Sequence, residues 1–304
     1  MYRIAAAILT LLVTLPVVAE TQTLAPKNQK AVLVTGASTG IGRKITEKLA
    51  ADGYFVYAGA RKEEDLRALG AIKNVQGVRL DVTKLEDIDA AVETIKRGGR
   101  GLYGLVNNAG IAAVGTLADL KPDEFDLVMA VNVYGPYRVT KAFEPLIVAE
   151  KGRIVTMGSI SGIGAPADLG AYAMSKHAME AFTDSLAAQM SDLGVQVSII
   201  EPGNFNSQIG KNATLRTGVV TRLTERSKYK EPDEVADAVE RALFEPKPKR
   251  RYMVAPDQDD AEWTIRKQIE QLVQLNERQP YTYGRDALIK MLDEVLAQAR
   301  PRPK

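Results

Sequence analysis

Tyr172 and Lys176 are the two residues of this 304-residue chain whose types and spacing best suit acid–base chemistry. They stand four positions apart, so a helix would place both side chains on one face. A phenol has a pKa of about 10 and is a weak base at neutral pH, whereas a nearby ammonium favours the phenolate and lowers that pKa. We therefore expect Tyr172 to take a proton from an alcohol, or to give one to a carbonyl, with Lys176 supplying the charge.

Ser159 is a third candidate, because it follows the strand predicted over 153–157. A hydroxyl at the end of a buried strand could hold the substrate oxygen while Tyr172 moves the proton. Composition narrows the choice of acid–base groups, since the chain has no cysteine and one histidine. Thiol catalysis, disulfides and Cys-ligated metal sites are excluded, and we expect no metal site.

A glycine-rich loop, Thr35-Gly-Ala-Ser-Thr-Gly-Ile-Gly42, stands between a predicted strand and a predicted helix. Gly36 permits a tight turn, Gly40 lets the backbone approach a diphosphate, and Gly42 allows the helix to pack closely on the strand. The free N–H groups and the dipole at a helix N-terminus favour an anion there. The loop therefore predicts a nucleotide site.

Strands alternate with helices from residue 31 onward, which predicts βαβ units in a mostly parallel sheet covered by helices on both faces. We expect one domain over 27–258 and a helical C-terminal extension over 259–304. The predicted strands are 31–35, 54–58, 75–80, 102–106, 153–157, 195–200 and 252–255, and the predicted helices are 42–52, 85–95, 123–148, 172–193, 261–275 and 285–299.

The glycine spacing, with the motifs that follow it, resembles the short-chain dehydrogenase/reductase family, and retinol- and steroid-type members in particular. Asn107-Asn-Ala-Gly110, Ser159, the Tyr-x-x-x-Lys pair and Pro202-Gly203 recur in the family's order over residues 31 to about 255. The resemblance implies a doubly wound Rossmann-type fold. It also implies catalytic roles for Asn132, Ser159, Tyr172 and Lys176, with Asn132 helping to hold a water that links Lys176 to solvent.

The same resemblance implies a set of residues that bind a nicotinamide cofactor. In it Asp81 would bond the adenine, and Pro202-Gly203 would contact the nicotinamide. The full set is Gly36, Ser38, Thr39, Gly40, Ile41, Gly42, Arg61, Asp81, Val82, Asn108, Ala109, Gly110, Tyr172, Lys176, Pro202, Gly203, Phe205 and Ser207.

Arg61, at the end of the second predicted strand, favours NADP. Dinucleotide folds that choose NAD usually place an acidic residue here for the ribose 2′-hydroxyl, and the first one is Glu63. Arg61 could instead pair with a 2′-phosphate. The family's other basic determinant is replaced by Thr39, so NAD stays open.

Residues 1–19 have the pattern of a signal peptide: Arg3, an apolar stretch from 4 to 19 and small residues at its end. The stretch is short for a membrane span, although an uncleaved anchor and an apolar tail packed on the domain are alternatives. We expect export to a periplasm or an equivalent space, or membrane anchoring. Because NADPH is a cytosolic cofactor, an uncleaved anchor that leaves the domain facing the cytoplasm is a further alternative.

The segment 204–230 resembles a lid over the substrate, and an apolar pocket is expected from Ile163, Ala165, Leu169, Phe205 and Leu215. The sequence thus predicts an NADP(H)-dependent oxidoreductase acting on an apolar secondary alcohol and a ketone or aldehyde. The alternative is a cofactor-binding interaction protein with vestigial catalysis. The resemblance implies a homodimer or homotetramer that pairs the predicted helices 123–148 and 172–193, which are apolar over more than one face. The net charge of +2 gives no reason to expect nucleic acid, and membrane contact would come through the N-terminal segment.

Overall fold

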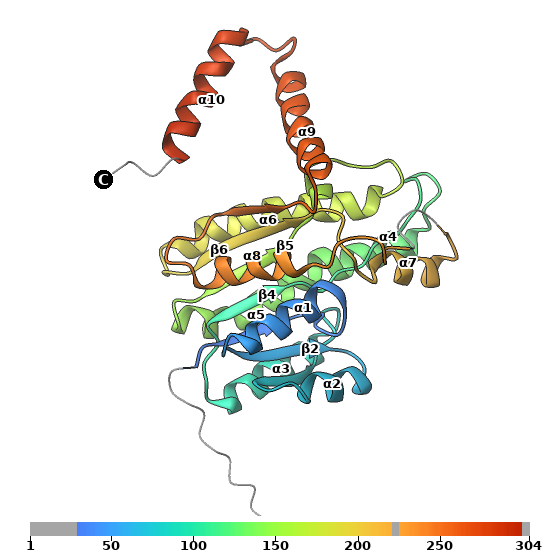
Figure 1. Cartoon of the computed structure of the whole chain (residues 1–304), viewed down its shortest axis with the longest axis vertical. Helices are drawn as coiled ribbons and strands as arrows, with labels where there is room; N and C mark the ends of the chain where they lie inside the picture. The colour runs from blue at the N-terminus through green and yellow to red at the C-terminus, as the bar shows by residue number, and fades with distance from the viewer. Residues whose placement is uncertain (1–28, 221–224, 300–304) are drawn as a thin grey trace, which may run out of the picture.

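The protein, a computed structural model, is described over residues 29–220 and 225–299. Seven parallel strands form one sheet in the order β3-β2-β1-β4-β5-β6-β7 (Figure 1). The strands are β1 Ala31–Val34, β2 Phe55–Ala60, β3 Val75–Arg79, β4 Gly104–Asn107, β5 Arg153–Met157, β6 Gln196–Pro202 and β7 Arg251–Val254. The order reverses between β1 and β4, and ligands of doubly wound sheets bind at that switch, beyond the carboxyl ends of the strands.

Helices cover both faces of the sheet, as the alternating pattern predicts. They are α1 Gly40–Ala51, α2 Glu63–Gly70, α3 Leu85–Gly98, α4 Pro122–Met129, α5 Gly135–Ala149, α6 Gly170–Ser191, α7 Ile209–Thr217, α8 Asp233–Phe244, α9 Gln258–Asn276 and α10 Arg285–Ala299. A π-helical turn, Ala130–Tyr134, and a 3₁₀ turn, Ile160–Gly162, complete the helical elements that the structure describes. The predicted helix ranges lack α2, α7 and α8.

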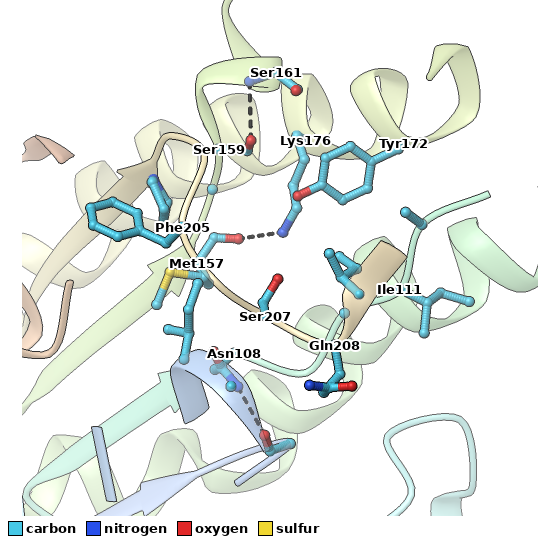
Figure 2. Close-up of a pocket in the computed structure, with 18 of the residues that line it drawn as sticks. Asn108, Ile111, Met157, Ser159, Ser161, Tyr172, Lys176, Phe205, Ser207 and Gln208 are labelled. Atoms are coloured by element: carbon cyan, nitrogen blue, oxygen red, sulfur yellow. Dashed lines mark hydrogen bonds between the residues drawn. The ribbon is translucent and has the colours of Figure 1, made fainter. Parts of the chain in front are cut away.

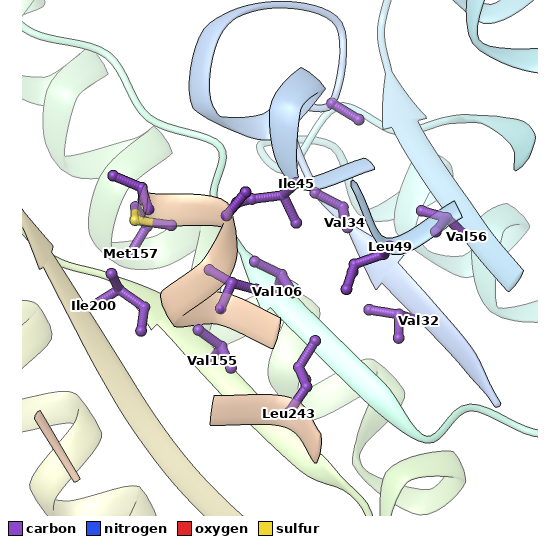
Figure 3. Packing of buried hydrophobic residues seen from close by; sticks show 14 of the residues in the cluster. Val32, Val34, Ile45, Leu49, Val56, Val106, Val155, Met157, Ile200 and Leu243 are labelled. Atoms are coloured by element: carbon purple, nitrogen blue, oxygen red, sulfur yellow. The ribbon is translucent and has the colours of Figure 1, made fainter. Parts of the chain in front are cut away.

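The hydrophobic core has two layers, because successive residues of each strand point to opposite faces. On one face Val32 and Val34 of β1 pack with α1 and α8, whose contacts include Ile45 and Leu243 (Figure 3). On the other face Leu33 packs with buried residues of α3, α5 and α6. Two buried faces explain why the strands read as continuous apolar runs rather than alternating ones.

The long helix predicted over 123–148 is interrupted by the π-helical turn, which joins α4 to α5. Such turns insert one extra residue into a helix and are frequent at functional sites. Asn132 lies within this turn and is buried. The interruption therefore sets the direction of a residue that the sequence assigns to the site.

The C-terminal helices extend away from the sheet, with α9 leaving the body and α10 turning back from its far end (Figure 1). Asp257 caps α9 by accepting a hydrogen bond from the Asp260 amide at 2.9 Å. Among the described residues no helix is both long and apolar enough to cross a bilayer. The predicted leader, 1–19, lies outside the described part of the chain.

Candidate active site

One cavity of about 820 Å³ runs from the glycine loop to Tyr172, and the residues of the predicted cofactor set converge on it (Figure 2). All eighteen of them line it: Gly36, Ser38, Thr39, Gly40, Ile41, Gly42, Arg61, Asp81, Val82, Asn108, Ala109, Gly110, Tyr172, Lys176, Pro202, Gly203, Phe205 and Ser207. Its lining includes the residues that follow β1, β4, β5 and β6. The cavity therefore occupies the place where ligands of this sheet architecture bind.

The glycine loop needs its glycines for close approach and for backbone shape. Gly36 has a φ of +64°, and a Cβ there would stand 2.8 Å from the Cα of Ala109. A Cβ on Gly42 would overlap the carbonyl oxygen of Gly36 and the side-chain amide of Asn108. Gly42 is thus required by the turn itself, whereas the sequence suggested helix–strand packing.

The first turn of α1 suits an anion. Thr39 occupies the N-cap position and makes no side-chain capping bond to the helix. The amides that begin a helix have no intrahelical partner, and the dipole adds positive potential. Thr39, Gly40 and the residues after them face the cavity, so a diphosphate fits the donors present.

Asn108 holds the glycine loop against the end of β4. Its side-chain nitrogen donates to the carbonyl oxygens of Thr35 at 2.9 Å and Gly36 at 3.1 Å. The Thr35 hydroxyl accepts in return from the amides of Asn108 and Ala109, each at 3.0 Å. These four bonds fix the loop before any ligand arrives, which makes Asn108 a positioning residue that also lines the cavity.

Arg61 and Asp81 lie at the opposite end of the cavity from Tyr172, where the resemblance places the adenosine. Burial acts to raise the pKa of Asp81, but hydrogen bonds from Thr83 and the charge of Arg61 outweigh it and lower that pKa. The amide and hydroxyl of Thr83 donate to Asp81 Oδ1 at 3.0 and 2.7 Å. Asp81 is therefore a fixed, ionised acceptor close to a cation.

Tyr172 and Ser159 both line the cavity. Burial raises the pKa of Tyr172, while a hydrogen bond with Ser159 and the charge of Arg226 act in the lowering direction. The expected lowering of this pKa by Lys176 is therefore wrong for the protein alone, because desolvation of the phenolate dominates. Ser159 also caps the 3₁₀ turn, accepting from the Ser161 amide at 3.1 Å.

Lys176 is buried beside Tyr172 on α6, and its ammonium donates to the carbonyl oxygen of Met157 at 2.7 Å (Figure 2). The ammonium lies 5.5 Å from the centre of the Tyr172 ring. Burial lowers the pKa of Lys176 to about 8, although Glu180 acts to raise it. Tyr172 and Lys176 thus lie side by side on α6, as their spacing predicts, and the ammonium is hydrogen-bonded to the end of β5.

Of the predicted catalytic and cofactor-binding residues, only Asn132 is absent from the cavity lining. Its side chain donates to the Ile111 carbonyl at 2.8 Å and to the Ser175 hydroxyl at 3.0 Å, and accepts from the Ile111 amide at 2.9 Å. The Ser175 hydroxyl donates to the Tyr172 carbonyl at 2.7 Å. Asn132 thus joins the loop after β4 to the turn of α6 that carries Tyr172.

The predicted apolar pocket is partly wrong. Ala165, Leu169 and Phe205 line the cavity, but Ile163 and Leu215 do not. Leu215 is 76% exposed because it lies on the outer side of α7. Other apolar side chains take their place: Ile111, Ala112, Ile160, Ile209 and Trp263.

Sequence reasoning missed the contribution of α9 and of the residues just before α8. Trp263 and Lys267 of α9 line the cavity, and so do Arg226 and Tyr229. Trp263 packs so closely on Gly164 that a Cβ there would stand 2.5 Å from its ring. Trp263 is the single tryptophan of the chain, and this was the one feature of the sequence that could have pointed to α9.

Comparison with known proteins identifies the family of the chain. A family model described as short chain dehydrogenase matches residues 30–217. The chain is 39% identical over 190 residues to the mitochondrial D-beta-hydroxybutyrate dehydrogenase of Bos taurus, covering 59% of this chain and 55% of that protein. It is 38% identical over 190 residues to retinol dehydrogenase 5 of Mus musculus, covering 60% and 59%. The match thus spans somewhat more than half the length of these relatives.

Solved structures share the fold. The structure of a short chain dehydrogenase from Burkholderia cenocepacia in complex with NADP superposes with a TM-score of 0.68 at 25% identity, covering 83% of this chain and 98% of that one. The family model covers more than half of the chain. This chain belongs to the short-chain dehydrogenase family.

Proposed function

We propose that this protein is an NADP(H)-dependent oxidoreductase that interconverts an apolar secondary alcohol with a ketone, or acts on an aldehyde, using Tyr172 as acid and base. One observation carries the proposal: a single cavity joins the anion-binding start of α1 to the hydroxyls of Ser159 and Tyr172. A phosphate-bearing cofactor and a small substrate would therefore lie in contact. The bound cofactor would supply or accept the hydride.

Each part of the cavity suits one part of the cofactor. The residues from Gly36 to Gly42 would hold the diphosphate, and Asp81 with Val82 would hold the adenine. Pro202, Gly203, Phe205 and Ser207 would hold the nicotinamide half. Arg61, which lies at the adenosine end, would pair with a 2′-phosphate, and this pairing is the reason for proposing NADP over NAD.

The proton moves through Tyr172. In alcohol oxidation the phenolate oxygen of Tyr172 takes the alcohol proton, and in carbonyl reduction the phenol gives it back. The Ser159 hydroxyl donates to the substrate oxygen and holds it in place as charge develops. Lys176 is mostly protonated at neutral pH, since its pKa is about 8, and its charge favours the phenolate.

Apolar side chains around the substrate end support an apolar substrate. Ile111, Ile160, Leu169, Ile209 and Trp263 contribute hydrocarbon surface to the cavity. Pockets of this kind derive affinity from apolar contact and orientation from a few polar groups. Here Ser159 and Tyr172 are the polar groups that would orient the reacting oxygen of the substrate.

The test is oxidation of NADPH and of NADH by the purified full chain over a panel of apolar ketones and aldehydes. NADPH turnover with at least one carbonyl, lost in Tyr172→Phe, supports the proposal. Tight NADPH binding without turnover across the panel would instead support a cofactor-binding protein with vestigial catalysis.

We further propose a homodimer or a homotetramer that pairs the faces of α5 and α6. Tyr134, Tyr137 and Met174 are each about half exposed on or beside these helices, and apolar exposure of this kind is typical of an interface. For residues 1–19 we propose an export signal, with an uncleaved anchor as the alternative.

A further inference from the structure

Asp260, in the first turn of α9, is bound to the turn that follows β6. Its Oδ2 accepts from the Asn204 backbone amide at 2.7 Å, and its Oδ1 accepts from the Asn204 side-chain nitrogen at 2.8 Å. A Cβ on Gly203 would overlap the same carboxylate. The C-terminal helix is thus joined directly to the Pro202-Gly203 turn, where the nicotinamide half would lie.

Asn204 also contacts Arg226 through its side-chain oxygen. Because its amide nitrogen donates to Asp260, its oxygen Oδ1 faces the other way and accepts from Arg226 Nη2 at 2.7 Å. The guanidinium lies 5.0 Å from the centre of the Tyr229 ring and lines the cavity. Three side chains from β6's end, the lid and α9 therefore form one hydrogen-bonded chain.

Arg226 lines the same cavity as Tyr172, and its charge acts to lower the pKa of that phenol, which burial raises. Lys176 loses its proton above its pKa of about 8, whereas a guanidinium keeps its charge. The charged groups that line this end of the cavity are Lys176 on α6, Arg226 in the lid, and Asp259, Asp260 and Lys267 on α9.

We propose that Asp260 and Asn204 are positioning residues that hold the Arg226 guanidinium in the cavity wall near Tyr172, so that the C-terminal helix is part of the active site. The inference rests on the proposed role of Tyr172 as acid and base. The geometry that carries it is the unbroken series of hydrogen bonds from Asp260 through Asn204 to Arg226.

Asp260→Asn tests the proposal through the sign of a pKa change. Removing a carboxylate would by itself lower the pKa of Tyr172, because a nearby negative charge disfavours the phenolate. If Asp260 acts by positioning Arg226, the released guanidinium moves away and the pKa rises instead. We expect a rise of about 0.5–1 unit, below the roughly 1–3 units that a fully placed opposite charge supplies.

The measurement is an ultraviolet titration of phenolate in the full chain, for each variant and for the same variant carrying Tyr172→Phe. The difference isolates one phenol among 11 tyrosines and needs neither substrate nor turnover. Asp259→Asn is the matched control, since it removes the same charge one residue away without touching Asn204. It should leave the Tyr172 titration unchanged or lower its midpoint.

A cycle with Arg226→Gln separates positioning from any direct effect. Asp260→Asn should raise the titration midpoint in the wild-type background and lose that effect when Arg226 is already Gln. Asn204→Ala should reproduce the rise, and thermal unfolding should show each variant folded. If Asp260→Asn does not fold, the Tyr172 titration midpoint of Asn204→Ala alone decides whether the positioning role holds.

A midpoint that stays or falls in both Asp260→Asn and Asn204→Ala would overturn the positioning role. That result leaves the proposed function standing, provided that Tyr172→Phe still abolishes turnover. Conversely, turnover that survives Tyr172→Phe would remove the proposed function, whatever the titration shows.

Discussion

The ammonium of Lys176, which lies 5.5 Å from the centre of the Tyr172 ring, donates to the carbonyl oxygen of Met157 at 2.7 Å and is thereby anchored to the last residue of β5. Since β5 also leads to Ser159, one strand end sets the place of the Ser159 hydroxyl and of the ammonium. Burial opposes ionisation of both Tyr172 and Lys176. Proton transfer by Tyr172 would therefore depend on neighbouring groups that stabilise the phenolate.

Tyr172→Phe should abolish turnover, with a loss of at least about a hundredfold that reflects the removed proton-transfer group. NADPH affinity should change little, because only the phenolic hydroxyl is lost. Steady-state kinetics and an NADPH titration check both parts. Tyr229→Phe is the matched control, since it removes a hydroxyl from another cavity-lining tyrosine. Near wild-type turnover in Tyr172→Phe would contradict the assignment.

Arg61→Asp should weaken NADPH binding by about 1–3 kcal/mol, the range for losing a charge-assisted contact to phosphate. NADH binding should weaken much less, because NADH lacks the 2′-phosphate. Fluorescence of Trp263, the only tryptophan in the sequence and a cavity-lining residue, can report both titrations. Arg67→Asp, an exposed change outside the cavity lining, is the charge control. Equal affinity of the wild type for NADH and NADPH would count against the NADP proposal.

Glu201 should make stability depend on pH. Burial and the neighbouring Glu180 raise the pKa of Glu201 from 4.5 to about 7, although Arg251 opposes them. The folded state then binds a proton more tightly than the unfolded state, so this contribution is full below about pH 4.5 and is lost as pH rises to about 7. The loss should be on the order of 1–3 kcal/mol.

Urea unfolding at several pH values between 4.5 and 7 measures how the free energy of unfolding changes with pH. Glu201→Gln should flatten this dependence, because the amide does not titrate. Asp184→Asn is a useful comparison: hydrogen bonding to Arg251 lowers the pKa of Asp184, so its contribution is lost on acidification. A steeper slope in Glu201→Gln than in the wild type would refute the assignment.

Tyr137→Glu should shift the protein from dimer or tetramer towards monomer at micromolar concentration. Tyr137 is 52% exposed on α5, and a carboxylate buried in a subunit interface is costly. Light scattering during size exclusion gives the mass of each form. Tyr281→Glu, which changes a 78% exposed tyrosine between α9 and α10, serves as control. A monomeric wild type would sink the prediction.

N-terminal sequencing of the mature protein should find Glu20 as the first residue, if residues 1–19 act as a cleaved signal. The small residue Ala19 precedes that position. An intact Met1 in the membrane fraction would instead show an uncleaved anchor. A reporter fusion that is active only in the cytoplasm would argue against export independently.

The order of elements and most of the site follow from the sequence itself. The glycine loop, the four-residue spacing of Tyr172 and Lys176 and the apolar strand runs are local patterns, and local geometry converts them directly into a turn, a helix face and buried strands. The strands are accordingly predicted to within about two residues, and all eighteen predicted cofactor residues line one cavity.

Tertiary structure decided what depends on distant segments. Burial by the whole fold sets the pKa direction of Tyr172, and no spacing in the sequence reports that burial. The π-helical turn makes Asn132 a bridge between Ile111 and Ser175, which are far apart in the chain. Asp260 meets Asn204 across 56 residues, because α9 returns to the end of β6. Contacts of that range arise only when the chain is folded, so the sequence pattern alone gave the extension no role in the site.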